Sequence, residues 1–147
     1  GPATVEALNT RGFQALSAPG DVSSVDSAES MVSNAIDGLG GLDILINNAG
    51  ILRDKSFKNM DMADWDIVMD VHLNGSGYVT RAAWPVMLEK RYGRIVFTSS
   101  TSGIFGNFGQ ANYGAAKMGM LGIMNVLAIE GLSKNIRVNT LAPASSS

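Results

Sequence analysis

The chain has 147 residues, of which 46 % are hydrophobic and 16 % are charged, and its formal net charge is −2. This length limits the chain to one domain, which we expect to occupy residues 1–147. With no cysteine and one histidine, the chain lacks the residues for disulfides and for cysteine- or histidine-based metal clusters, so we expect no metal. The charge gives no indication of nucleic-acid binding, and the longest apolar stretches are strand-sized, so we expect no membrane span.

The first forty residues predict two helices separated by a short strand. Residues 3–11 fit the end of a helix that Gly12 terminates, and residues 13–17 are a strand candidate. An amphipathic helix follows, with Ser24 as its candidate N-cap and three glycines after position 37 at its end.

The middle and end of the chain alternate between apolar strands and helical patterns. Residues 42–46 read LDILI, which is typical of a strand covered on both faces. A long helical pattern then runs from about residue 61 to residue 90, where Pro85 is expected to kink or break it. Residues 94–100 predict another strand, and a helix over 113–132 and a last strand over 136–141 follow.

Strands that alternate with helices at this spacing predict parallel strands joined by right-handed crossovers. The chain is too short for a closed barrel of eight such units. The expected fold class is therefore α/β, with an open, doubly wound parallel sheet of the Rossmann type.

The stretch from Thr98 to Lys117 combines three polar side chains that suit acid–base chemistry. Tyr113 and Lys117 lie four residues apart and share a helix face, and Ser100 lies at the end of a strand. A nearby ammonium favours the phenolate and lowers the tyrosine pKa, while a serine hydroxyl can donate to the same substrate oxygen. The alternative is an exposed helix face with a serine in a turn.

Two further segments follow strand candidates. Asn48, Ala49 and Gly50 come after residues 42–47, where small residues let a ligand approach the backbone, although paired asparagines also form plain turns. Asp21 and Val22 follow the strand candidate at 13–17. Asp21 is either a turn residue or an acceptor for an adenine amino group.

Together these segments resemble the short-chain dehydrogenase/reductase family in order and spacing. The matching pieces are Asp21-Val22, Asn47 to Gly50, Ser100, Tyr113-x-x-x-Lys117 and Val138 to Pro143. Within the family, ILRDKSF, VHLNG, RAAWP and AIEG resemble the (3R)-hydroxyacyl-CoA dehydrogenase domains of peroxisomal multifunctional enzymes and their bacterial relatives. The GNFGQANY loop also resembles β-ketoacyl-carrier-protein reductases.

The resemblance implies reversible hydride transfer between NAD or NADP, with NAD slightly favoured, and a 3-hydroxyacyl or 3-ketoacyl thioester. Tyr113 is then the general acid–base, Ser100 orients the substrate oxygen, and Lys117 lowers the tyrosine pKa and holds the nicotinamide ribose. Asp21 and Val22 would meet the adenine. Asn48, Ala49 and Gly50 would line the path of the adenosine ribose and phosphates.

The chain departs from the family pattern in three places. His72 stands where many members have an asparagine that organises a proton relay, so it is either a catalytic residue or a packed structural histidine. Ala144 follows Pro143 where the family often has glycine. The family's glycine-rich phosphate loop and first strand should precede Ala3, so we expect an incomplete fold that extends beyond both ends and is inactive or weakly active by itself.

Two other expectations concern assembly and alternatives. The charged fraction of 16 % is below the usual quarter, which suggests covered surface and a homo-dimer or homo-tetramer built on the helices near residues 64–90 and after Tyr113. The location is expected to be cytoplasmic in a bacterium and peroxisomal in a eukaryote. The alternative to an enzyme is a non-catalytic scaffold of the same family. A serine hydrolase is disfavoured because no G-x-S-x-G motif is present.

Overall fold

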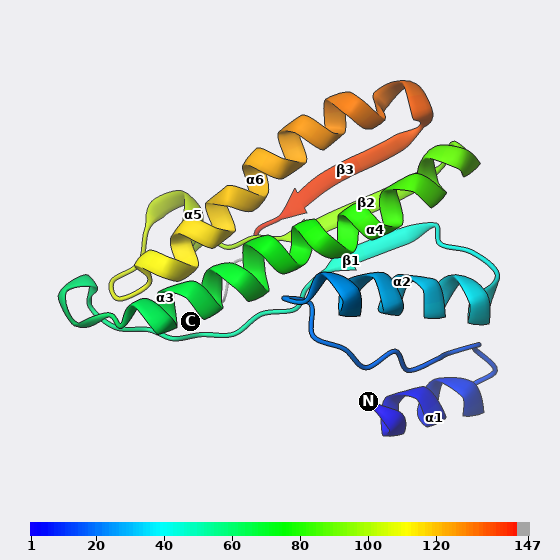
Figure 1. Ribbon diagram of the computed structural model, residues 1–147, viewed down its shortest axis with the longest axis horizontal. Helices are drawn as coiled ribbons and strands as arrows, with labels where there is room; N and C mark the ends of the chain where they lie inside the picture. The colour runs from blue at the N-terminus through cyan, green and yellow to red at the C-terminus, as the bar shows by residue number, and fades with distance from the viewer. Residues whose placement is uncertain (144–147) are drawn as a thin grey trace.

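The computed structural model describes residues 1–143 and is built on a parallel sheet of three strands (Figure 1). The strands are β1 (Ile44–Asn47), β2 (Gly93–Thr98) and β3 (Ile136–Leu141), and they lie in the order β1-β2-β3. In the parallel register, Leu45 is opposite Ile95 and Phe97 is opposite Thr140. This architecture confirms the predicted α/β class with a parallel, incomplete Rossmann-type sheet.

Six α-helices accompany the sheet in the described part of the chain. They are α1 (Pro2–Thr10), α2 (Val25–Leu39), α3 (Met62–Met69), α4 (Gly75–Lys90), α5 (Thr101–Phe105) and α6 (Ala111–Gly131). Short 3-10 turns occupy Phe57–Asn59 and Leu132–Lys134. Ser24 caps α2 as predicted, with its side chain accepting from the Ser27 amide, and Gly40 ends that helix at φ +85°.

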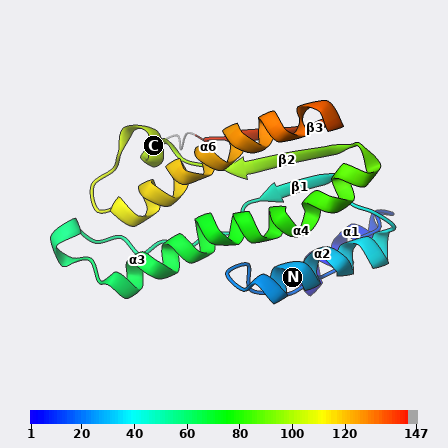
Figure 2. The same cartoon turned by 45° about the horizontal axis from the view of Figure 1, so that its top comes forward.

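Helices α4 and α6 lie along the same face of the sheet, and α2 packs beside α4 (Figures 1 and 2). The strands follow one another across the sheet in chain order, so right-handed crossovers place both connecting helices on one side. The core lies between this face and the helices. Its buried members are Val32, Ala83, Met87, Ile95, Phe97, Met120, Ile136 and Val138.

The prediction that residues 42–46 are covered on both faces is wrong for the described residues. Ile44 and Ile46 are 59 % and 63 % exposed, and exposed and buried positions alternate along β1 and β3. The apolar run in β1 therefore has a covered face and an open face, because both crossovers pass over the same side.

The strand predicted at residues 13–17 is not formed. Phe13 and Leu16 are exposed, and residues 13–20 pair with no strand in the described chain. The segment is instead tied to α1, where the Asn9 side chain accepts from the Ala15 amide and donates to its carbonyl. A strand needs a neighbour for its backbone hydrogen bonds, and the three strands described leave none beside this segment.

The long helix predicted from residue 61 to residue 90 changes geometry at a different place from the one expected. Asp61 caps α3, as its side chain accepts from the Ala63 amide, but α4 continues through Pro85. The irregularity is a π-helical turn at Asp70–Asn74, which separates α3 from α4.

Helix α6 is the longest helix among the described residues. It packs against β3, β2, α3 and α5. By length and composition alone, the segment Ala111–Lys134 is long and apolar enough to cross a membrane. Core helices meet the same criterion, but the sequence expectation of strand-sized apolar stretches overlooked this segment.

Candidate active site

The site is built where β2 ends and α6 begins. Tyr113 and Lys117 project from the first two turns of α6, and the Lys117 Nζ atom lies 5.4 Å from the centroid of the tyrosine ring. Lys117 is only 3 % exposed, and its ammonium donates to the Thr98 carbonyl at 2.5 Å. Burial lowers the pKa of Lys117, so the cation is held at the end of β2 at an electrostatic cost.

His72 reaches the same place from the π-helical turn. Its ring meets the Tyr113 ring edge-on, with centroids 5.1 Å apart and planes at 89°. The imidazole is 2 % exposed, and its Nε2 lies 3.0 Å from the Ile51 amide nitrogen and 2.7 Å from the Ile51 carbonyl oxygen. Burial is the main reason that the pKa of His72 is lowered; the Ile51 carbonyl opposes this, and the Lys117 charge adds to it.

The packing around His72 is close and leaves one ring nitrogen without a protein partner. A Cβ atom added at Gly50 would come 2.3 Å from the His72 Cε1, so the ring fits only against glycine. The Nδ1 atom has no hydrogen-bond partner among the described residues. His72 is therefore a closely packed residue, and it also lies beside Tyr113. Whether it takes part in the reaction stays a prediction.

A cavity of about 450 Å³ opens between these groups. Five of its eight lining residues carry polar side chains, and these five come from the ends of β1 and β2, from the π-helical turn and from α6. It is lined by Asn48, Gly50, Ile51, Leu52, His72, Thr98, Tyr113 and Lys117.

Ser100 lies in an adjoining hollow of about 460 Å³ rather than in the first cavity. Tyr113 and Leu52 line both hollows, so the tyrosine stands between the serine and the lysine. Ser100 also caps α5, since its hydroxyl accepts from the Ser102 amide at 3.2 Å. The other lining residues of this hollow are Thr101, Ser102, Asn107, Gln110 and Pro143.

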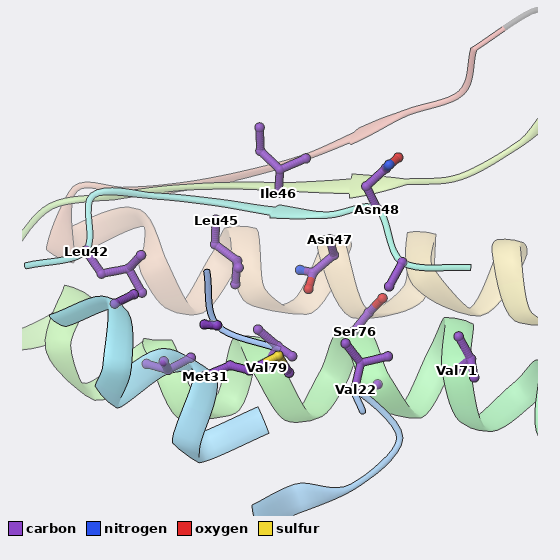
Figure 3. A pocket seen from close by; sticks show the side chains of 15 residues that line it. Val22, Met31, Leu42, Leu45, Ile46, Asn47, Asn48, Val71, Ser76 and Val79 are labelled. Atoms are coloured by element: carbon purple, nitrogen blue, oxygen red, sulfur yellow. The ribbon is translucent and has the colours of Figure 1, made fainter. Parts of the chain in front are cut away.

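The predicted cofactor residues fall into two groups. Val22, Asn48 and Ala49 line a mostly apolar cavity of about 240 Å³ between α2, α4 and β1, and Gly50 lines the polar cavity beside it. Figure 3 shows the Leu45 and Asn47 side chains pointing from β1 toward the helices, with Ile46 on the opposite side of the strand.

Asp21 lies outside the lining of these cavities. It is exposed, and its carboxylate accepts from the Ser23 amide at 2.9 Å and from the Ser23 hydroxyl at 2.6 Å. These bonds lower the pKa of Asp21. In this structure the residue forms the turn before α2, and its contact with adenine stays a prediction.

Three buried polar residues that the sequence reasoning did not assign hold the site together. Ser99 donates to the Lys117 carbonyl at 2.8 Å, and Asn47 donates to the Thr80 hydroxyl at 2.9 Å. Asn112 lies next to Tyr113 and is fully buried. The adjacent polar residues in Asn47-Asn48, Thr98-Ser99-Ser100 and Asn112-Tyr113 were the only hint at them, because a local pattern does not identify the partner of each side chain.

The chain belongs to the short-chain dehydrogenase family, whose sequence model matches residues 1–147.

Curated relatives are similar over most of the chain. The mouse peroxisomal multifunctional enzyme type 2 is 58 % identical over 120 residues, which cover 82 % of this chain and 16 % of the mouse protein. The Dictyostelium discoideum peroxisomal multifunctional enzyme A is 56 % identical, covering 84 % of this chain and 28 % of that protein. An acetoacetyl-CoA reductase of Allochromatium vinosum is 48 % identical over 94 % of this chain and 56 % of the reductase. The chain thus spans little more than half of the reductase and less of the multifunctional enzymes.

Proposed function

We propose that this chain is part of the catalytic domain of an NAD(P)-dependent oxidoreductase that interconverts 3-hydroxyacyl and 3-ketoacyl thioesters. The observation that carries the proposal is the placement of Tyr113 beside the buried Lys117 ammonium at the carboxyl edge of a parallel sheet. The names of the relatives, which include an acetoacetyl-CoA reductase, support a short acyl thioester as the substrate class.

Each polar side chain has one task in this proposal. Tyr113 donates a proton to the substrate oxygen during reduction and accepts it during oxidation. The buried Lys117 ammonium, which lies beside the tyrosine ring, stabilises the negative charge that develops on the phenolic oxygen during proton transfer. Ser100 donates a hydrogen bond to the same oxygen from the adjoining hollow, and His72 holds Ile51 beside the tyrosine ring.

A nicotinamide cofactor, NAD or NADP, supplies or accepts the hydride when it is bound. The polar cavity suits the nicotinamide ribose, because Lys117 has three N–H donors and only one of them is bonded to the Thr98 carbonyl. Ala49 and Gly50 present little side-chain bulk beside it. We assign Asn48, Ala49 and Gly50 to the adenosine ribose and phosphates, and Asp21 and Val22 to the adenine.

The test is Tyr113→Phe in the full-length protein, assayed by NADH or NADPH oxidation with acetoacetyl-CoA. Loss of positioned acid–base catalysis should lower kcat by about 10²- to 10⁴-fold. Tyr92→Phe is the matched control, because Tyr92 precedes β2 at the opposite end of the strand and stacks on Arg94. A Tyr113→Phe variant that keeps near wild-type turnover would contradict the proposed mechanism.

The same assay separates the two acyl carriers. We expect the coenzyme A thioester to be turned over with a higher kcat/KM than the matching carrier-protein thioester, as the relatives' names suggest. The reverse preference would favour the β-ketoacyl-carrier-protein reductase alternative.

We further propose a homo-dimer or homo-tetramer assembled on α4 and α6, with no membrane or nucleic-acid partner. Val126 and Ile129 are exposed apolar residues on α6, which fits a covered surface. A monomer in size-exclusion chromatography of the full-length protein would contradict this assembly.

The names of the relatives fit a peroxisomal location in a eukaryote, and we propose the cytoplasm for a bacterial source.

A further inference from the structure

The residue before Tyr113 is the most completely hydrogen-bonded side chain at the site. Asn112 is 0 % exposed. Its Nδ2 donates to the Arg53 carbonyl at 3.2 Å and to the Asp64 carbonyl at 3.1 Å, and its Oδ1 accepts from the Tyr113 amide at 2.7 Å. A buried amide costs free energy unless it is paired, and here both donors and the acceptor are used.

These three bonds join three separate parts of the chain. Arg53 belongs to the loop that follows the predicted cofactor segment, Asp64 belongs to α3, and Tyr113 lies in the first turn of α6. The Tyr113 amide is one of the first N–H groups of α6, which have no intrahelical acceptor. Gln110, at the N-cap position, makes no capping hydrogen bond, so Asn112 supplies the acceptor.

His72 binds the same loop through the backbone of Ile51. Leu52, which lines both hollows, stands between Ile51, bonded to His72, and Arg53, bonded to Asn112. Other links between the loop and α6 exist, such as Gln110 to Asp54 at 2.8 Å. That pair is exposed to solvent and contributes little, whereas the Asn112 bonds are shielded.

We propose that Asn112 is a positioning residue for the reaction, which fixes Tyr113 and the Leu52 loop in one arrangement between Ser100 and Lys117. It touches neither hollow, so it acts only through its neighbours. This inference rests on the proposed function, in which Tyr113 transfers the proton. A displaced tyrosine lowers the rate because acid–base catalysis depends on placement.

The test compares Asn112→Ala with Asn34→Ala, an exposed asparagine on α2, in the full-length protein. We expect kcat to fall by about 10- to 100-fold with Asn112→Ala, while the KM for the cofactor stays within about twofold. Hydrogen exchange at the Tyr113 amide should also become faster, since its acceptor is removed. Asn34→Ala should change none of these.

Asn112→Asp gives a second measurement that a purely structural role would not reproduce. The protonated acid keeps an acceptor for the Tyr113 amide and one donor for a carbonyl, whereas the carboxylate has no donor. Burial raises the pKa of such a carboxyl, so the ratio of variant to wild-type kcat should fall as pH rises. This variant at low pH also carries the test if Asn112→Ala does not fold.

The outcomes separate this inference from the proposed function. If Tyr113→Phe is inactive while Asn112→Ala keeps kcat within about twofold, Asn112 does not position the tyrosine. A pH-independent ratio for Asn112→Asp would overturn it equally. If Tyr113→Phe itself remains active, the proposed function fails and the inference fails with it.

Discussion

The regions on either side of the carboxyl end of β1 differ in the interactions that their residues make. One region lies beside α6 and the other lies beside α2. On the α6 side, buried polar groups bind one another: Lys117 donates to Thr98, Ser99 donates to Lys117, and Asn112 joins α6 to the neighbouring loop. On the α2 side, the cavity is lined mostly by apolar side chains, and Ile44 and Ile46 are exposed on the sheet face away from the helices.

The difference reflects where the partners of each region come from. The stretch from Thr98 to Lys117 closes on itself, because a strand end and the helix that follows it supply both donor and acceptor within twenty residues. The apolar cavity instead depends on segments far apart in sequence, such as Val22, Leu45 and Val79. The Lys117 ammonium is therefore held by contacts within a short stretch of the chain, while Asn112 and the apolar cavity depend on contacts between segments far apart in sequence.

The strongest test of the closed region removes its buried cation. Lys117→Met should lower kcat by about 10²- to 10³-fold, because the reacting phenolic oxygen loses the positive charge beside it. Burial lowers the pKa of Lys117, so the wild-type enzyme should lose activity as pH rises through a value below 10.5. A pH–rate profile checks both effects, and this alkaline limb should be absent from the variant.

Lys58→Met is the matched control for that experiment, since Lys58 is exposed in a short 3-10 turn. It should leave the pH profile unchanged. A Lys117→Met variant with the wild-type pH–rate profile would mean that the Lys117 charge does not contribute to catalysis by Tyr113.

A smaller effect is expected from His72 and concerns stability. Because burial lowers the pKa of His72 below 6.5, the unfolded chain binds a proton that the folded chain resists. The free energy of unfolding should therefore fall as pH drops below about 6.5 toward the lowered pKa, by at most about 1.4 kcal/mol per pH unit. Above this range the histidine is neutral in both states and the contribution is constant.

Urea unfolding of the wild type and of His72→Asn between pH 7.5 and pH 5, about where only histidine titrates, measures this term. The asparagine variant should lack the acid slope while retaining a polar group at the site. Parallel curves for the two proteins would contradict a buried, neutral His72.

The smallest effect is expected on the open side of the sheet. Ile46→Ala should change the free energy of unfolding by only about 0.5 kcal/mol, since the side chain is 63 % exposed. Ile95→Ala, the same substitution in the buried core of β2, should cost about 2–5 kcal/mol. Denaturant unfolding compares the two directly, and similar costs would mean that another surface covers the open face in solution.

Local spacing was enough to predict that Ser100, Tyr113 and Lys117 lie near the end of β2, and it predicted the order of most strands and helices. Ser100, Tyr113 and Lys117 were found because a strand end and a helical period place them within twenty residues. Asn112 and Ser99 could not be assigned, because their roles depend on Arg53, Asp64 and the Lys117 carbonyl. The segment 13–17 was predicted as a strand from composition, but composition does not supply the hydrogen-bonding neighbour that a strand needs.

The π-helical turn at Asp70–Asn74 sets the angular phase between α3 and α4. Such a turn closes its hydrogen bond over one more residue than an α-helical turn does, and each α-helical residue advances about 100° around the axis. Straightening it would rotate α3 by about that angle and carry the buried Val68 away from the core. The same turn thus sets both the direction in which His72 faces Tyr113 and the side of α3 that faces the core. Deleting a single residue between positions 70 and 74 would disturb both at once.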